Sequence, residues 1–534
     1  MKKFNTTAVC IPEKHYMVDL SERVKEIKKL IDAGEYFTIN RARQYGKTTT
    51  IAALERFLSE QYDVVSIDFQ DVTDADFANE SKFVKGLSEV LCNARDDMDA
   101  PIPDKFYDLF KNLSVREKDA TQNDFFKIID EWCKTDEKPV ILIIDEVDTA
   151  TNNQVFLDFL AKLRSGYLKK EKYPKYKFFQ SVILAGVTDV KHLKSKIRKE
   201  EDSKLNSPWN IAADFTVDMS LSEDGIQGML DEYEADHSVG MDTASIAKKI
   251  RDYTNGYPYL VSRICQLIDE QFVPDKFESL AEAWNENGID EAVKCILSEE
   301  NSLFESVMGK LIDMPKMKDE LKRILFCGET VPNLPDDEEQ KMLRMYGFIV
   351  NEHNTVAVSN RIFEMRLYNF FIGNSRYSKE VRADAVEHKP EFIKDGILDV
   401  ALIMERFIKS QKTIRNIFDE NAEKRFIEEE GREKFLTYLS PILNGVGTFS
   451  IEEQTRNGRR MDVVIHYNGR RYIIELKIWH GDRYNENGEK QICDYLDYFG
   501  LNTGYMLSFS FNRNKEPGVR RVEIGDKVLF EGVV

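Results

Sequence analysis

Two acidic residues and a lysine near the C-terminus have the types and the spacing that metal-dependent hydrolysis requires. Asn468-Gly469 separates two apolar-alternating runs, and this dipeptide predicts a two-residue type I′ hairpin turn. With that turn, Asp462 lies opposite Glu475 across the hairpin. Lys477 points to the same face, because side chains alternate along a strand. Two carboxylates directly opposite each other repel, so the pattern favours a cation between them.

The cation that fits these carboxylates is Mg²⁺, which prefers oxygen ligands and is often held by one or two carboxylates. A metal-bound water beside the ammonium of Lys477 is suited to hydrolysing a phosphodiester. The alternative is an exposed hairpin on which Glu475 and Lys477 form an ordinary surface pair. That alternative explains poorly why charged residues interrupt the apolar run 473–476.

A second group of chemically capable residues lies near the N-terminus. There Gly46-Lys47-Thr48 follows a short apolar run and precedes a helical pattern, which is the context of a phosphate-binding P-loop. Backbone amides at the helix start face the phosphates. Lys47 is expected to reach the β- and γ-phosphates, and the hydroxyl of Thr48 is expected to bind Mg²⁺. Arg41 stands where the usual motif has its first glycine. The alternative is a simple helix cap.

A carboxylate pair follows the next strongly apolar run. Residues 139–144 predict a buried parallel strand, and Asp145-Glu146 comes directly after it, as in a Walker B motif. We expect Asp145 to hold Mg²⁺ through water and Glu146 to polarise the attacking water; solvation of a strand end is the alternative. ATP and Mg²⁺ are therefore the expected cofactors.

The elements that must position these groups form a parallel sheet. Its expected strands are residues 36–40, 64–69, 139–144, 181–187 and 215–218. Thr188 or Asp189 then falls at the sensor-1 position, on the C-terminal edge where such sheets bind ligands. An ordinary loop residue is the alternative there. The expected fold class is α/β.

Residues 1–370 resemble a family of AAA-like ATPases of the STAND type, whose P-loop reads R-x-R-x-[FY]-G-K-[ST], as from Arg41 to Thr48. Arginine in place of glycine is therefore consistent with that family. Thr254–Val261 is similar to its GxP element, in which Pro258 packs near adenine; a turn without ligand contact is the alternative. Arg263 is a candidate sensor-2 residue. The nucleotide-binding residues that the resemblance implies are Arg43, Gly46, Lys47, Thr48, Thr49, Asp145, Thr188 and Pro258.

The C-terminal segment resembles the PD-(D/E)xK nuclease superfamily. The match is Asp462 followed by Glu475-Leu476-Lys477, with Met461 where the family name has proline. The resemblance implies an α/β nuclease-like domain in which Asp462 and Glu475 hold the metal. Lys477 would orient the nucleophile or stabilise the developing charge.

Two predicted helices flank this hairpin. On the first, Glu433 is a candidate metal-facing acid, with a solvated face as the alternative. On the second, Gln491 and Tyr495 share one face, and they either resemble an extended nuclease motif or cover the core. Basic residues that could position a phosphate backbone gather in the same region. They are Arg456, Arg459, Arg460, Arg470, Arg471, Arg513, Lys515, Arg520 and Arg521. The expected partner of the C-terminal domain is nucleic acid, specifically DNA.

The length and composition of the chain limit the number of domains and the classes of function that it can have. A chain of 534 residues has room for about three domains. Its net charge of −19 argues against indiscriminate coating of nucleic acid, although it permits a local basic site. The seven cysteines form no CxxC pair, which fits a reducing cytoplasm and excludes a zinc ribbon. No signal peptide or membrane span is expected. Assembly into a homo-oligomer is left open.

The expected organisation is an ATPase followed by a nuclease-like domain. Its parts are a P-loop AAA-like core (1–220), a helical lid (221–300), a winged-helix-like region (301–370), a helical connector (371–425) and a PD-(D/E)xK nuclease-like domain (426–534). The acidic segment 334–339 favours a regulatory or packing role for the winged-helix-like region over DNA reading.

Two functions fit this organisation. The favoured one is an ATP-binding and ATP-hydrolysing enzyme coupled to a Mg²⁺-dependent endonuclease that cuts DNA. The alternative is a nucleotide-dependent signalling or scaffold switch whose C-terminal domain binds nucleic acid or a partner without cutting. The two differ in whether Asp462, Glu475 and Lys477 converge on one metal-sized site.

Overall fold

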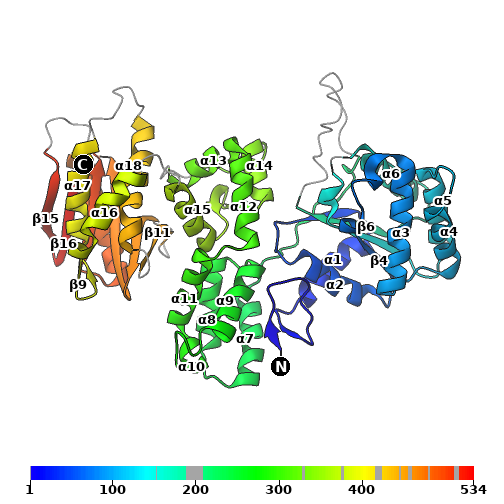
Figure 1. Cartoon of the computed structure of the whole chain (residues 1–534), viewed down its shortest axis with the longest axis horizontal. Coiled ribbons are helices and arrows are strands. Elements are labelled where there is room, and N and C mark those ends of the chain that lie inside the picture. The colour runs from blue at the N-terminus through cyan, green and yellow to red at the C-terminus, as the bar shows by residue number, and fades with distance from the viewer. Residues whose placement is uncertain are drawn as a thin grey trace. The chain divides into compact units, whose positions relative to one another are not determined.

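In the computed structural model the chain forms two compact units (Figure 1). Unit 1 comprises Met1–Met308 and Lys341–Phe348, and unit 2 comprises Gly309–Gln340 and Ile349–Val534. The described residues are 2–151, 153–187, 208–326, 331–373, 378–414, 424–443, 447–454, 460–478, 482–509 and 516–534. Some side chains inside these ranges lie outside the description, including those of Asp462, Lys477 and Gln491. The finer domain boundaries expected from the sequence stay predictions.

A four-stranded parallel sheet in the order β3-β6-β5-β4 forms the centre of unit 1. Its strands are β3 (Phe37–Asn40), β4 (Asp63–Asp68), β5 (Val140–Asp145) and β6 (Ser181–Gly186). Every residue of β5 and β6 is buried, as expected of apolar parallel strands that are covered on both faces. The predicted α/β fold with a parallel sheet is confirmed for this unit.

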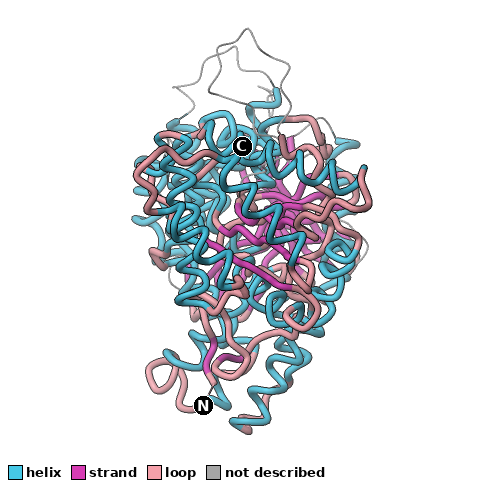
Figure 2. Tube along the Cα trace, turned by 90° about the vertical axis from the view of Figure 1, so that its right-hand side faces the viewer, coloured by secondary structure: helices cyan, strands magenta, loops and turns pink. Residues whose placement is uncertain are grey.

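Helices cover both faces of that sheet, so that the strands run inside layers of helices (Figure 2). They are α1 (Ser21–Asp32), α2 (Lys47–Leu58), α3 (Glu80–Met98), α4 (Asp104–Ser114), α5 (Gln122–Thr135) and α6 (Gln154–Lys172). Helices α1 and α2 pack on the face that carries Ile39, Ile143 and Ile183. Helices α3, α5 and α6 pack on the opposite face, against Leu142 and Leu184. Short elements complete this part: β1 (Lys3–Phe4), β2 (His15–Tyr16), and the 3₁₀ turns η1 (Phe69–Asp71), η2 (Asp76–Ala78) and η3 (Val147–Thr149).

One strand prediction for this unit is wrong. Residues 215–218 form no strand, and beside β3 only Ala213 makes an isolated bridge, to Phe37. The segment is held by side chains instead, because the guanidinium of Arg41 donates to the carbonyl of Val217. Residues 346–348 form a turn that follows α14 (Glu338–Met345). In that turn the amide of Phe348 closes back on the carbonyl of Leu343, a pattern that satisfies the last carbonyls of a helix.

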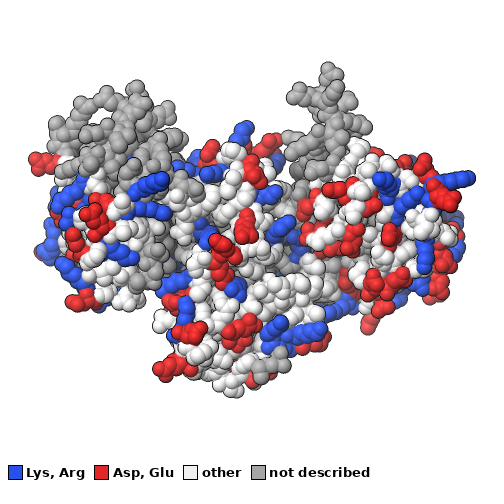
Figure 3. Space-filling view, viewed as in Figure 1, with Lys and Arg blue, Asp and Glu red and all other residues white. Residues whose placement is uncertain are grey.

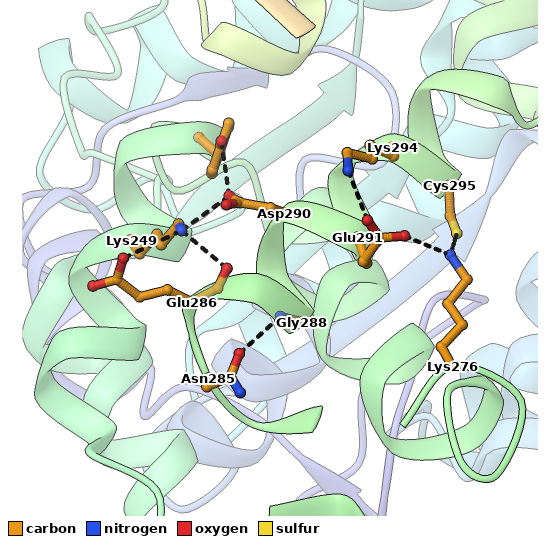
Figure 4. A network of polar contacts seen from close by, with 10 residues as sticks. Lys249, Lys276, Asn285, Glu286, Gly288, Asp290, Glu291, Lys294 and Cys295 are labelled. Atoms are coloured by element: carbon orange, nitrogen blue, oxygen red, sulfur yellow. Dashed lines mark hydrogen bonds and ion pairs between the residues drawn. The ribbon is translucent and has the colours of Figure 1, made fainter. Parts of the chain in front are cut away.

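A helical bundle follows the sheet in unit 1. Its helices are α7 (Glu223–His237), α8 (Thr243–Thr254), α9 (Pro258–Gln271), α10 (Leu280–Ala283), α11 (Glu286–Ser298) and the start of α12 (Ser302–Asp313). Lys249 of α8 forms ion pairs with Glu286 and Asp290 of α11, at 3.5 and 2.9 Å (Figure 4). Glu291, on the same helix, pairs with Lys276 at 2.9 Å. Such surface pairs contribute little stability, so the buried apolar faces of these helices supply most of it.

Unit 2 is built on a six-stranded mixed sheet in the order β11-β12-β13-β14-β16-β15. Its strands are β11 (Gly447–Gln454), β12 (Arg460–Tyr467), β13 (Arg470–Ile478), β14 (Thr503–Phe509), β15 (Gly518–Ile524) and β16 (Lys527–Val533). Strands β13, β14 and β16 are parallel, and the other pairings are antiparallel. The remaining elements of the chain are α13 (Pro315–Phe326), α14 (Glu338–Met345), β7 (Ile349–Glu352), β8 (Thr355–Val358), α15 (Arg361–Gly373), α16 (Ser378–Phe392), β9 (Ile393–Lys394), β10 (Ile397–Leu398), α17 (Val400–Ile414), α18 (Lys424–Leu443) and α19 (Asp482–Phe499).

The two faces of this sheet are covered by different helices. A Cβ placed on Gly504 would lie 3.0 Å from Ile492 and from Leu496, so α19 covers the face that Gly504 belongs to. On the other face, a Cβ on Gly532 would lie 2.8 Å from Met404, which places α17 there. Helix α17, in the segment expected as a connector, therefore packs directly on the sheet. Because side chains alternate along each strand, the face of any sheet residue in this unit follows from its register.

Candidate functional site

The Gly-Lys-Thr loop joins β3 to α2, as the sequence predicts for a P-loop. Gly46 caps the helix with φ 77°, a left-handed conformation that glycine adopts without strain. The next residue, Lys47, is buried, and its Nζ donates to the carbonyls of Arg41 and Ala42 at 3.2 and 3.3 Å. Burial lowers the pKa of Lys47, while the nearby carboxylates of Glu146 and Asp145 act in the opposite direction. A cation is thus held under the loop, opposite the acidic ends of the strands.

Thr48 and Asp145, the two residues expected to bind Mg²⁺ at this loop, lie together, and Glu146 follows Asp145 directly. The hydroxyl of Thr48 donates to Oδ2 of Asp145 at 3.0 Å, and the backbone amide of Glu146 donates to Oδ1 of the same carboxylate at 2.9 Å. Glu146 has φ 53°, so the chain turns sharply after β5. Burial raises the pKa of Glu146, and the neighbouring Asp145 and Asp148 raise it further, against an opposing effect from Lys47. A carboxylate with a raised pKa is suited to accepting a proton.

Two carboxylates at this edge were not singled out from the sequence. Asp68 ends β4 and is paired with Asp145 in the sheet register. Asp148 accepts a hydrogen bond of 2.7 Å from the amide of Val187, which follows β6. The signal for Asp148 was its position three residues after Asp145, in the sequence Asp-Glu-Val-Asp. Thr188, the expected sensor-1 residue, lies outside the described residues.

Arg41, which stands where the usual motif has its first glycine, contacts residues that flank the loop. Its Nη1 donates to the carbonyl of Asn40 and its Nη2 to that of Val217, both at 2.9 Å. The guanidinium also lies over the ring of Phe215, 5.2 Å from the centroid, and its amide donates to the carbonyl of Gly186 at 3.1 Å. These contacts tie the start of the loop to the sheet. The side chain of Arg43, by contrast, is exposed.

Arg41→Ala is expected to lower the free energy of unfolding by about 1–3 kcal/mol, because it removes two charge-assisted hydrogen bonds and a cation–π contact. Arg43→Ala is the matched control and should leave the melting temperature unchanged, since that side chain is exposed. If Arg43 contacts phosphate, its variant should instead weaken ATP binding by about ten-fold. Thermal melts and ATP titrations separate the two roles. An unaltered melting temperature in Arg41→Ala would contradict the prediction that Arg41 stabilises the start of the loop.

Residues from later in unit 1 also reach the loop. Pro258 lies next to Gly46, since a Cβ on that glycine would be 3.7 Å from its Cγ, and the hydroxyl of Tyr257 donates to the carbonyl of Arg43. The hydroxyl of Thr49 accepts from the amide of Cys10 at 3.2 Å. Pro258 and Thr49 therefore both lie beside the loop, and their contact with a nucleotide stays a prediction.

The other sensor candidate does not reach the loop through any described contact. Arg263 pairs with Glu299 at 2.5 Å and donates to Gln266 at 2.8 Å. Its guanidinium is therefore engaged within the helical bundle. In contrast, the turn that follows α14 does reach the loop, because a Cβ on Gly347 would lie 2.7 Å from the Cβ of Ala42.

In unit 2 the predicted hairpin and its register are confirmed. Asn468 and Gly469 have φ 49° and 72°, and Tyr467 pairs with Arg470. The described pairs run from Tyr467 opposite Arg470 to Val463 opposite Ile474, and the expected pair of Asp462 and Glu475 lies one residue beyond them. Glu475 is only 2% exposed. The side chains of Asp462 and Lys477 lie outside the description, so their convergence with Glu475 stays a prediction.

Two of the other candidate residues on this domain, Glu433 and Tyr495, have contacts that the structure describes. Glu433 is buried and pairs with Lys322 of α13 at 2.9 Å, which engages the carboxylate that was a candidate metal ligand. Tyr495 is 1% exposed and belongs to the apolar core under α19, in agreement with the core-covering alternative. The side chain of Gln491 lies outside the description. Among the described residues, no group of three or more His, Cys, Asp or Glu side chains is arranged to hold a metal ion.

The parallel sheet, the lysine-bearing loop and the carboxylates that follow β5 place unit 1 in the class of P-loop ATPases. The chain belongs to the family of AAA-like domains, whose family model matches residues 9–369. No curated protein matches the chain. In the part of the chain that the structure describes, no helix is both long and apolar enough to cross a membrane.

Several solved structures are similar to this chain at low identity. A Walker-type ATPase of Pyrococcus abyssi is 15% identical, with a TM-score of 0.44, over 68% of this chain and 99% of that one. The RuvB Holliday junction branch migration motor of Thermotoga maritima is 12% identical, with a TM-score of 0.32, over 64% and 92%. The Orc1 protein of Aeropyrum pernix, solved in complex with DNA, is 9% identical, with a TM-score of 0.30, over 66% and 93%.

Proposed function

We propose that this AAA-like protein binds and hydrolyses ATP, and that its C-terminal domain is a Mg²⁺-dependent nuclease of the PD-(D/E)xK type acting on DNA. The first half of the proposal rests on the family and on the contacts of the Gly-Lys-Thr loop. The second half rests on the hairpin of unit 2. ATP hydrolysis and DNA cleavage can be tested separately, because each activity depends on different carboxylates that can be substituted one at a time.

The residues around the loop fit a nucleotide with Mg²⁺. The hydroxyl of Thr48 and the carboxylate of Asp145 lie 3.0 Å apart, so both can face one small cation. When bound, Mg²⁺ would neutralise charge on the β- and γ-phosphates. Lys47 would exchange its bonds to loop carbonyls for bonds to phosphate oxygens. Glu146, with its raised pKa, would accept a proton from the attacking water.

The nuclease proposal is carried by the buried carboxylate of Glu475 in the observed hairpin register. Burying a charge is costly, so a carboxylate at 2% exposure in a strand is held by groups that compensate for its lost hydration. Continued by one residue, the register supplies Asp462 as its neighbour, and a cation between the two would offset their repulsion. Glu475 also lies towards the C-terminal end of β13, and ligands of α/β sheets bind at that end of parallel strands.

Incubation of the full-length protein with supercoiled plasmid and Mg²⁺, with and without ATP, tests this proposal. Glu475→Gln is expected to reduce nicking and linearisation at least about 100-fold, because a metal ligand contributes several kcal/mol. Glu523→Gln is the matched control, since Glu523 is an exposed carboxylate of the same sheet. Equal cleavage by both variants would contradict the assignment of Glu475.

The alternative function is a nucleotide-dependent switch whose C-terminal domain binds without cutting. One observation favours it, namely that Glu433 pairs with Lys322 instead of facing an open site. Plasmid that is bound but left intact by the wild-type protein, in Mg²⁺ with or without ATP, would support this alternative. ATP hydrolysis is expected under both functions.

A further inference from the structure

An exposed arginine at the edge of the unit 2 sheet is held by a buried carboxylate. The side chain of Glu531, on β16, is 3% exposed, whereas that of Arg520, on the edge strand β15, is 63% exposed. Nε and Nη2 of the guanidinium both bond to Oε2 of Glu531, at 2.6 and 2.5 Å. Figure 3 shows Lys and Arg atoms at this outer edge of unit 2, where Figure 1 places β15.

This pair lies in the same cross-strand row as Glu475. Glu475 pairs with Met506 of β14, Met506 pairs with Glu531, and Glu531 pairs with Arg520. Residues that pair across a sheet share a face, so all four side chains lie on the face that α19 covers in part. Neighbouring strands are about 4.8 Å apart, which puts Arg520 roughly 14 Å across the sheet from Glu475.

The geometry of the pair leaves one edge of the guanidinium for another anion. Glu531 takes Nε and one Nη2 proton, and no other partner of Arg520 occurs among the described residues. The remaining Nη1 and Nη2 protons form the planar fork that binds phosphate oxygens in pairs. The buried carboxylate fixes the direction of that fork, which lowers the entropy lost when a phosphate binds.

We infer that Arg520 binds a backbone phosphate of DNA that crosses the C-terminal ends of β13, β14 and β16, with Glu531 as its positioning residue. The inference rests on the proposed function for the choice of ligand. A span of roughly 14 Å corresponds to about four nucleotides along one strand of a duplex, at 3.4 Å each. The contact would therefore fall a few nucleotides from the cleaved bond and would not read sequence.

Arg521 provides a matched control on the same strand. It follows Arg520 directly, so its side chain points to the opposite face of the sheet. It is also exposed, and it pairs with Glu523 at 2.7 Å, another exposed residue. The two arginines thus have equal charge and similar exposure, and differ in face and in partner. An effect of bulk positive charge would be the same for both.

The test measures binding of a fluorescent DNA duplex to full-length protein in EDTA, over a series of salt concentrations. Arg520→Ala should raise the Kd by about 5–20-fold at low salt and reduce the slope of log Kd against log salt by about one. The sequence groups Arg521 with Arg520 among the basic residues that could position a phosphate backbone, but the register turns Arg521 to the opposite face of the sheet. Arg521→Ala should therefore change the Kd less than two-fold. Glu531→Gln should weaken binding about 2–5-fold in the wild-type background and have no effect in the Arg520→Ala background.

Equal effects of the two arginine substitutions, or an unaltered salt slope in Arg520→Ala, would overturn the inference. Absence of DNA binding by the wild-type protein would overturn it as well. Thermal melts of each variant show whether a loss of binding comes from unfolding. Arg520→Lys keeps the positive charge but lacks the planar pair of N–H donors, so it should bind DNA more weakly than the wild type. Plasmid that stays uncut while binding depends on Arg520 would refute the nuclease proposal and leave this inference standing.

Discussion

Lys47→Ala is expected to weaken ATP binding by about 100-fold or more and to remove ATP hydrolysis. The ammonium of Lys47 is buried beneath the loop, where its only described acceptors are the carbonyls of Arg41 and Ala42. Phosphate oxygens are stronger acceptors for a cation than neutral carbonyls. Two charge-assisted hydrogen bonds lost at about 1.5–3 kcal/mol each account for this factor.

Titration of a fluorescent ATP analogue into the full-length variant measures this loss. Lys28→Ala is the control, because Lys28 pairs with Asp32 on the surface of α1, within the same unit. The control should bind ATP as the wild type does. Removal of a buried cation also removes its desolvation cost, so the melting temperature of Lys47→Ala without nucleotide should stay close to that of the wild type. Undiminished ATP affinity in the Lys47 variant would show that the loop is not a P-loop.

Glu146→Gln is expected to keep ATP binding and to slow hydrolysis by about 10²–10⁴-fold, the usual contribution of a general base. Glutamine has the same shape but cannot accept a proton from water. Asp145 would still face Thr48 in this variant, so the expected magnesium ligands are untouched. Single-turnover hydrolysis, together with ATP titration, distinguishes the loss of chemistry from a loss of binding.

The pH profile of hydrolysis adds a second readout for Glu146. Burial and the carboxylates of Asp145 and Asp148 raise its pKa above the ordinary value of a glutamate. The deprotonated form accepts the proton, so acidification should reduce the rate at a higher pH than an unperturbed carboxyl would. Asp148→Asn should reduce hydrolysis less than Glu146→Gln, because its amide oxygen can still accept from Val187. A wild-type rate in Glu146→Gln would assign the base elsewhere.

Local chemistry explains why some features were predictable from the sequence. The hairpin follows from Asn-Gly at its turn, since this dipeptide tolerates two successive positive φ angles. The loop before α2 follows from Gly46, which caps that helix with a positive φ. The apolar runs at β5 and β6 predict buried parallel strands, because strands that are covered on both faces carry no polar alternation.

Long-range packing decided what the sequence left open. Arg41 braces the loop because Phe215 and Val217 come back beside β3, nearly two hundred residues later. The same side-chain contacts explain why residues 215–218 are not a strand. Glu433 is a candidate metal-facing acid from the sequence, with a solvated face as the alternative, but α13 brings Lys322 against it from more than a hundred residues earlier. None of these pairings has a periodic signature in the chain.

The sequence by itself determined two local features of this protein: a Gly-Lys-Thr loop between β3 and α2, with acidic residues after β5, and a hairpin that turns at Asn468-Gly469. Both depend on residues close together in the chain, or on strands whose apolar pattern is strong. Only the tertiary structure decided which groups join them. Strand order brings Asp68 beside Asp145, and it aligns Glu531 and Arg520 with Glu475. Sheet order depends on the burial of whole faces, and that free energy is not a property of any one segment.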